Sequence, residues 1–117
     1  MLISLIVPCY NEAEALPLFY AEAARVAKEM QQSHGALFEF IFVDDGSKDD
    51  TLKTAKALRE KDGRVRYLSF SRNFGKEAAI YAGLRAAKGD YAALLDADLQ
   101  DPPALLPEML NALLTGE

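Results

Sequence analysis

The chain has 117 residues, of which 50% are hydrophobic, and a formal net charge of −5. This length supports one hydrophobic core and a single domain, and the acidic balance disfavours non-specific nucleic acid binding, which basic residues drive. The single cysteine, Cys9, excludes an intrachain disulfide and fits a reducing, cytoplasmic setting.

Four short β-rich runs alternate with four segments of helical period, which predicts βαβ units around a parallel sheet. The runs are Leu2 to Val7, Phe38 to Val43, Val65 to Phe70 and Tyr91 to Leu95. Three of these runs are almost continuously apolar, as expected for strands that are covered on both faces, whereas the third alternates in polarity. We therefore predict an α/β fold with the third strand at one edge of the sheet.

Apolar residues recur at spacings of three and four between these runs, as expected for helices that pack one face on a sheet. The predicted apolar faces are Phe19, Ala23, Val26, Ala27 and Met30; Leu52, Ala55 and Leu58; Ile80, Leu84 and Ala87; and Leu105, Leu106, Met109 and Leu113. Asn11 and Glu14 have the spacing of a capping box before the first helix, although Pro17 suggests that the regular helix begins nearer to Leu16. The chain ends at Glu117, directly after the fourth predicted helix, so we expect it to be a truncated part of a longer protein.

Polar clusters follow the predicted strands, at the edge where open α/β sheets bind their ligands. The clusters are Pro8-Cys9-Tyr10-Asn11-Glu12, Asp44-Asp45-Gly46-Ser47, Ser71-Arg72-Asn73-Phe74-Gly75-Lys76 and Asp96-Ala97-Asp98-Leu99-Gln100-Asp101. Arg72 and Lys76 form the only basic pair near these loops. We expect Tyr10, Asp45, Asp96 and Asp98 to face one crevice at the carboxyl edge of the sheet.

Asp96 and Asp98 are two residues apart, so in an extended segment both carboxylates leave the same face of the chain. Such hard oxygen ligands suit Mg²⁺ or Mn²⁺, which complete their coordination with water and substrate phosphate. Gln100, two residues further on, has an amide oxygen that could join them. A metal at this position would allow an acidic pocket to accept a diphosphate, because the ion inverts the local charge.

Each cluster taken alone also has a plainer explanation. An Asp pair after a strand is often a helix cap and a solvated turn, and Asp44-Asp45-Gly46-Ser47 has the composition of a turn in which Gly46 adopts positive φ. Cys9 is expected to be a small buried residue without a functional role. The presence of polar clusters after all four strands is what favours a binding site.

The chain resembles the family 2 inverting glycosyltransferases of GT-A fold over essentially its whole length. The matching segments are Ile6-Val7-Pro8-Cys9-Tyr10-Asn11-Glu12, Val43-Asp44-Asp45-Gly46-Ser47-Lys48-Asp49 and Leu94-Leu95-Asp96-Ala97-Asp98. Two further segments are similar to the branch that loads a sugar onto a polyprenyl phosphate. These are Ser71-Arg72-Asn73-Phe74-Gly75-Lys76-Glu77 and Asp98-Leu99-Gln100-Asp101-Pro102-Pro103.

The resemblance implies a Rossmann-like GT-A sheet of order 3-2-1-4 with helices on both faces. It also implies that residues 1–117 form the nucleotide-sugar-binding, N-terminal part of the domain. The implied nucleotide-binding residues are Pro8, Tyr10, Glu12, Asp44, Asp45, Arg72, Lys76 and Asp96, with Asp45 accepting a hydrogen bond from the base. The implied metal ligands are Asp96, Asp98 and Gln100, and Asp98 is the implied catalytic residue.

The implied reaction moves a sugar, with inversion, from a nucleoside-diphosphate sugar to a polyprenyl phosphate with the help of Mg²⁺ or Mn²⁺. A lipid phosphate is already anionic near neutral pH, so the acceptor requires no general base. In that branch, segments that this chain lacks bind the acceptor and contact the membrane. We therefore expect the full-length protein to act at the cytoplasmic face of the membrane. We expect this chain alone to bind the donor but to transfer the sugar poorly or not at all. The sequence is compatible with an oligomer.

Two alternatives stay open at this point. A signalling receiver domain is also an acidic α/β domain of this size with an Asp pair that binds Mg²⁺, although its acidic pair follows the first strand and here Pro8 and Cys9 stand there. A binding-only module would retain the sugar nucleotide without catalysing its transfer. The sequence names neither the base and sugar of the donor nor the acceptor.

Overall fold

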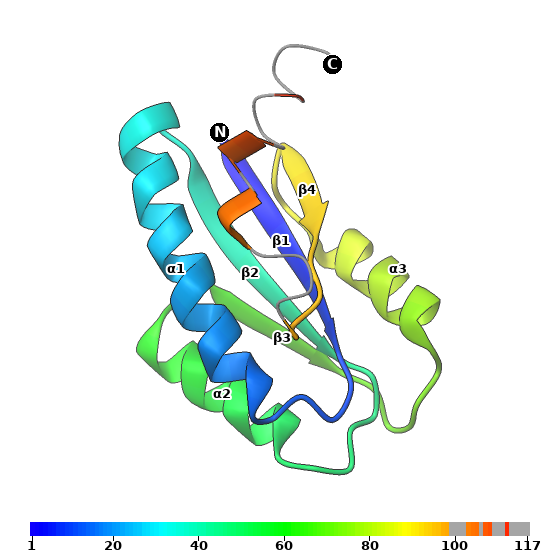
Figure 1. The fold of residues 1–117 in the computed structure, drawn as a ribbon. Helices are drawn as coiled ribbons and strands as arrows, with labels where there is room; N and C mark the ends of the chain where they lie inside the picture. Colours follow the sequence, from blue (N-terminus) through cyan, green and yellow to red (C-terminus); the bar gives the residue numbers. More distant parts are fainter. Residues whose placement is uncertain (99–102, 106, 109–111, 113–117) are drawn as a thin grey trace.

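The computed structural model describes residues 1–98, 103–105, 107–108 and 112. Its four strands are β1 (Leu2–Cys9), β2 (Leu37–Asp44), β3 (Val65–Ser69) and β4 (Tyr91–Leu94). They form one parallel sheet of order β3-β2-β1-β4, which confirms the predicted α/β class and strand order (Figure 1).

The strand β1 lies inside the sheet and pairs with β2 along its whole length, from Leu2 with Leu37 to Cys9 with Asp44. Its other side pairs with β4 over four residues. The strand β3 pairs with β2 alone among the described strands, and after the buried Val65 its side chains alternate between half-buried and exposed. The predicted edge position of the third strand is therefore confirmed.

Helices cover both faces of this sheet. The helices α1 (Ala15–His34) and α2 (Thr51–Lys61) lie on one face, and α3 (Lys76–Ala86) lies on the other (Figure 1). A short 3₁₀ helix, η1 (Pro103–Leu105), contacts α1. None of the helices in the described part of the chain combines the length and the apolar character that a bilayer crossing requires.

The helix α1 buries the face that its sequence predicts. Phe19, Ala23, Val26, Ala27 and Met30 are all buried, together with Leu16. The ring of Phe19 meets that of Phe42 edge to face, with 6.3 Å between the ring centroids. Burying one such side chain stabilises the fold by about 1.5–3 kcal/mol, so this face accounts for much of the attachment of α1 to the sheet.

The predicted capping box before α1 is wrong. Glu14 occupies the N-cap position without a side-chain hydrogen bond, and Leu16 N–H donates instead to the backbone carbonyl of Glu12. Asn11 adopts a left-handed φ of 53° and uses its amide side chain elsewhere, as described below for the site.

The predicted apolar face of α3 is wrong at Leu84, which is 47% exposed. The helix instead presents Ala79 and Gly83 to the sheet. A β-carbon at Gly83 would lie 2.4 Å from Cγ2 of Ile6, so the helix backbone approaches the sheet too closely for a large side chain. The predicted fourth helix falls largely outside the described residues, and its Leu105 lies in η1 and is 44% exposed.

A buried carboxylate joins the sheet to the connection that follows α3. Glu39 is 7% exposed and accepts hydrogen bonds from Ser4 Oγ (2.5 Å), Arg66 Nη1 (2.8 Å) and Lys88 N–H (2.7 Å). Burial alone would raise the pKa of Glu39, but these three donors outweigh it and hold the pKa below its ordinary value. The charged form of Glu39 therefore stabilises the fold.

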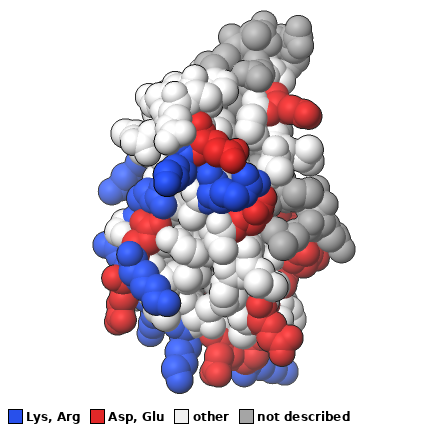
Figure 2. Space-filling view, turned by 60° about the vertical axis from the view of Figure 1, so that its left-hand side comes forward, with Lys and Arg blue, Asp and Glu red and all other residues white. Residues whose placement is uncertain are grey.

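Basic and acidic side chains are interspersed on the face of the molecule that Figure 2 shows. Ion pairs among the described residues include those of Arg25 with Glu22 and Glu29, and of Arg64 with Asp62.

Candidate functional site

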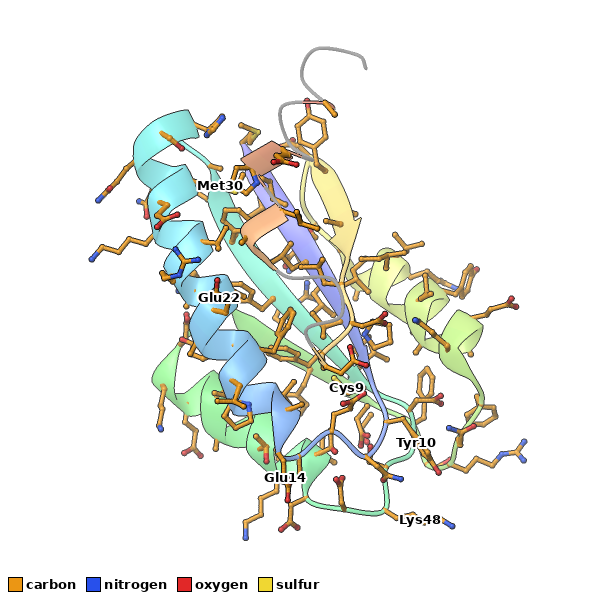
Figure 3. All side chains as sticks on the ribbon, viewed as in Figure 1. Cys9, Tyr10, Glu14, Glu22, Met30 and Lys48 are labelled. Carbon is orange, nitrogen blue, oxygen red and sulfur yellow. The ribbon has the colours of Figure 1, made fainter. Side chains whose placement is uncertain are left out.

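A cleft of about 240 Å³ lies at the carboxyl edge of the sheet. Its lining residues are Pro8, Cys9, Tyr10, Glu12, Asp45, Lys76, Asp96 and Asp98. Figure 3 shows Cys9 and Tyr10 at the end of β1. The predicted convergence of Tyr10, Asp45, Asp96 and Asp98 on one crevice is thereby confirmed, while their binding roles stay predictions.

The topology explains why these residues meet. The strands β1 and β4 are neighbours and parallel, so the segments that leave their carboxyl ends emerge side by side. The chain leaves β1 toward α1 on one face and reaches β4 from α3 on the other (Figure 1). Open α/β sheets bind ligands at such points, where successive connections turn to opposite faces.

The loop between β1 and α1 is held by the loop between β2 and α2. Asn11 N–H donates to Ser47 Oγ (2.9 Å), and the Asn11 side-chain oxygen accepts from Lys48 N–H (2.9 Å). Glu12 N–H donates to the buried hydroxyl of Thr51 (2.9 Å). These bonds fix the backbone around Tyr10 and Glu12, and sequence reasoning missed them because they join residues 36 to 39 positions apart.

Asp44 has a structural position. Its side chain is buried and Oδ1 accepts a hydrogen bond from Ser47 N–H (3.0 Å), closing a turn in which Gly46 has a φ of 71°. The turn interpretation of this segment is therefore confirmed for Asp44, which does not line the cleft. Cys9 is 2% exposed, as expected for a buried residue, and burial raises the pKa of its thiol well above the ordinary value.

Asp45 lines the cleft and is 4% exposed. Its carboxylate accepts hydrogen bonds from Asn73 Nδ2 (3.2 Å), Phe74 N–H (2.8 Å) and Gly75 N–H (3.1 Å). All three donors belong to the loop between β3 and α3. The resemblance implies that the Asp45 carboxylate contacts the base. In the structure this carboxylate is bound by the loop between β3 and α3.

The two predicted basic residues lie in different places. Lys76, the first residue of α3, lines the cleft and forms an ion pair with Asp96, with 2.7 Å between Nζ and Oδ1. Arg72 does not line the cleft, and its guanidinium lies 4.5 Å from the ring centroid of Phe74. Only Lys76 therefore places its charge among the acidic side chains.

Four carboxylates line the cleft, those of Glu12, Asp45, Asp96 and Asp98. Burial raises the pKa of Glu12, and the nearby charges of Asp98 and Asp96 raise it further. A cation in the cleft would relieve this repulsion, and the oxygen donors of Asp96 and Asp98 are of the kind that Mg²⁺ and Mn²⁺ prefer.

The described residues hold no group of three or more His, Cys, Asp or Glu arranged as a complete metal site. Mg²⁺ bound by one or two carboxylates commonly completes its coordination with water and substrate phosphate. The third predicted ligand, Gln100, lies outside the described residues.

The open parallel sheet, with a polar cleft at the point where its connections change face, defines an α/β ligand-binding domain of Rossmann-like type. The sequence profile of Glycosyl transferase family 2 matches residues 4–117, and the chain belongs to that family. The receiver-domain alternative is wrong, since receivers have the order 2-1-3-4-5 and this sheet has 3-2-1-4.

Named relatives share this segment. The bactoprenol glucosyl transferase of Shigella phage SfV is 45% identical over 111 residues, which are 95% of this chain and 35% of that protein. The undecaprenyl-phosphate 4-deoxy-4-formamido-L-arabinose transferase of Pseudomonas paraeruginosa is 39% identical over 116 residues, 98% of this chain and 33% of that protein. The chain therefore spans about a third of the length of the curated relatives it matches.

A solved structure of glucosyl-3-phosphoglycerate synthase from Mycobacterium tuberculosis is similar to the fold, with a TM-score of 0.70 and 30% sequence identity. The similarity covers 98% of this chain and 40% of that one. That structure is a complex with Mn²⁺, UDP and glucosyl-3-phosphoglycerate. The GT-A fold expected from the resemblance is confirmed.

Proposed function

We propose that the protein is a glycosyltransferase that moves a sugar, with inversion, from a nucleoside-diphosphate sugar to a polyprenyl phosphate at the cytoplasmic face of a membrane. Residues 1–117 form its donor-binding, N-terminal part. The observation that carries the proposal is the single cleft that gathers Tyr10, Glu12, Lys76, Asp96 and Asp98. Family membership and the names of the two polyprenyl-linked relatives support the same reaction class.

The nucleoside end of the donor lies against Pro8, Tyr10 and Glu12. Tyr10 is 41% exposed at the cleft, so its ring is available to a flat base, and aromatic rings stack on bases without strong preference between them. The Glu12 carboxylate is an acceptor for a ribose hydroxyl. Hydrogen bonds from the backbone of Asn11 and Glu12 to Ser47 and Thr51 already hold this segment, which lowers the entropy lost on binding.

The diphosphate lies beside Lys76, Asp96 and Asp98, where Lys76 and Asp96 form their ion pair. Asp96 and Asp98 would hold the Mg²⁺ or Mn²⁺, which would supply Lewis-acid stabilisation of the negative charge on the leaving diphosphate. Lys76 adds a second positive charge at the same place. The acceptor phosphate carries its own negative charge, so no side chain of the cleft has to remove a proton from it.

Donor binding can be tested by calorimetric titration with UDP and with GDP, in Mn²⁺ and in EDTA. We expect one of the two nucleotides to bind, and to bind much more weakly in EDTA, because an acidic cleft repels a diphosphate that arrives without a cation. Equal affinity in EDTA would contradict the metal role, and binding of neither nucleotide would contradict the proposed function.

Transfer can be tested in the full-length protein with radiolabelled nucleotide sugars and undecaprenyl phosphate in detergent. Label in the lipid fraction would support the proposal. Donor binding without transfer to any acceptor would identify a binding-only module, and preferential labelling of a sugar or protein hydroxyl would contradict the polyprenyl-phosphate assignment.

A further inference from the structure

We propose that Asp45 is a positioning residue for the diphosphate end of the donor. In this role it holds the loop between β3 and α3, residues 70–75, and thereby places Lys76 in the cleft. This differs from selecting the base, which is the role that family resemblance implies for Asp45. The inference rests on the donor site proposed above, and it assigns Asp45 to the part of that site that binds the diphosphate.

The first observation is that the hydrogen-bonding capacity of the Asp45 carboxylate is largely used. Asn73 Nδ2, Phe74 N–H and Gly75 N–H all donate to it, and Gly75 N–H lies within 3.3 Å of both oxygens. A carboxylate has about four acceptor positions, and this one is 4% exposed. A base would have to compete with these donors for what is left.

The second observation is the close approach of the same two segments at Gly46. A β-carbon on Gly46 would lie 2.2 Å from the carbonyl carbon of Arg72 and 2.4 Å from the Asn73 nitrogen. The loop backbone therefore lies directly against the turn that carries Asp45. Side-chain hydrogen bonds and backbone contact fix the loop from two neighbouring residues.

The third observation is where this loop leads. Gly75, whose N–H donates to Asp45, is the N-cap of α3 and adopts a φ of 105° that L side chains rarely reach. Lys76 follows it as the first helical residue, and its Nζ lies 2.7 Å from Asp96 Oδ1. A continuous chain of contacts thus runs from Asp45 through Gly75 and Lys76 to Asp96, at the predicted metal position.

The two roles make different demands on the ligand. A residue that selects the base affects only ligands that have a base. A residue that positions Lys76 affects every ligand with a diphosphate, including inorganic pyrophosphate, because the contribution of Lys76 is to the phosphate charge. Comparison of UDP or GDP with pyrophosphate therefore separates the roles.

The test measures dissociation constants in saturating Mn²⁺ by calorimetry for pyrophosphate and for whichever of UDP and GDP binds the unmodified protein. Asp45→Asn should raise the dissociation constants of both ligands by a similar factor, roughly tenfold, because it removes the charge that holds the three donors of the loop. Lys76→Met should also weaken both. The double variant should bind no more than about twofold more weakly than Lys76→Met, because the two residues act in series.

Asn73→Ala serves as a second variant that keeps the Asp45 carboxylate and removes one of its donors from the loop. Asn73→Ala should raise the dissociation constants of both ligands by a smaller common factor. If Asp45→Asn does not fold, the result with Asn73→Ala tests the positioning role instead. A loss confined to the nucleotide in either variant, or unchanged affinity for both ligands in Asn73→Ala, would overturn the inference. Failure of the unmodified protein to bind any of the ligands would instead overturn the proposed function.

Discussion

Replacing Lys76 with methionine should make the protein bind Mn²⁺ more tightly when no nucleotide is present. In the structure the ammonium of Lys76 lies 2.7 Å from one oxygen of Asp96, which is a predicted metal ligand. A divalent ion that binds Asp96 must displace this ammonium or share the oxygen with it. Methionine has a similar length and no charge, so the substitution removes the competition and retains most of the packing.

The size of the effect follows from the exposure of the pair. Two unit charges 2.7 Å apart attract each other by about 1.5 kcal/mol at the dielectric constant of water. The Lys76 side chain is 61% exposed, and the cost of ordering such a side chain reduces the net value to about 1 kcal/mol. This corresponds to about a fivefold lower dissociation constant for Mn²⁺.

The assay is a titration of Mn²⁺ followed by electron paramagnetic resonance, at physiological salt and without nucleotide. Arg85→Met is the matched control, because it removes one positive charge from the same helix about 13 Å further along. That distance exceeds the ~8 Å screening length at physiological salt. Unchanged or weaker Mn²⁺ binding by Lys76→Met, or an equal gain in Arg85→Met, would refute the reasoning.

Three further predictions concern the metal, the buried carboxylate and the turn. Asp98→Asn should abolish metal-dependent nucleotide binding in calorimetry while leaving the thermal unfolding midpoint nearly unchanged. Glu39→Gln should lower the free energy of unfolding in urea by roughly 2–3 kcal/mol at neutral pH. Because the pKa of Glu39 is depressed in the folded state, this difference should shrink as pH falls below the ordinary value of 4.5 and through the folded pKa. Gly46→Ala should lower the urea midpoint of unfolding more than Gly35→Ala. Both glycines have positive φ, but of the two only a β-carbon at Gly46 would lie within 4 Å of other backbone atoms. Equal urea midpoints for the two variants would contradict this.

The strands and α1 could be predicted because their signals are local and repeated. Continuous apolar runs identify strands that are covered on both faces, and the spacing of Phe19, Ala23, Val26 and Met30 matches the period of a helix. The cleft could be predicted because parallel strands bring their carboxyl ends to one edge. Neither prediction required knowledge of contacts between particular distant side chains.

The errors came from non-local contacts. The α3 face was misjudged at Leu84 because hydrophobic periodicity favours large residues, whereas the close approach at Gly83 demands small ones. The capping box failed because Asn11 bonds Ser47 and Lys48 across the neighbouring loop. No local pattern indicates that the carboxylate of Asp45 would bind backbone amides 29 and 30 residues later.

The pairing of β1 with β4 has a consequence for how ligand binding relates to folding. Residues 3 to 6 pair with residues 91 to 94, so the two sides of the cleft are joined only after nearly the whole chain has been arranged. Partial unfolding that separates β1 from β4 would therefore destroy the cleft. A ligand that binds only the folded chain, present at 100 times its dissociation constant, should raise the free energy of global unfolding by about 2.7 kcal/mol. Amide hydrogen exchange along β1 and β2, far from the bound phosphate, should then slow together with exchange in the loops, so occupancy of the cleft would report on the integrity of the entire sheet.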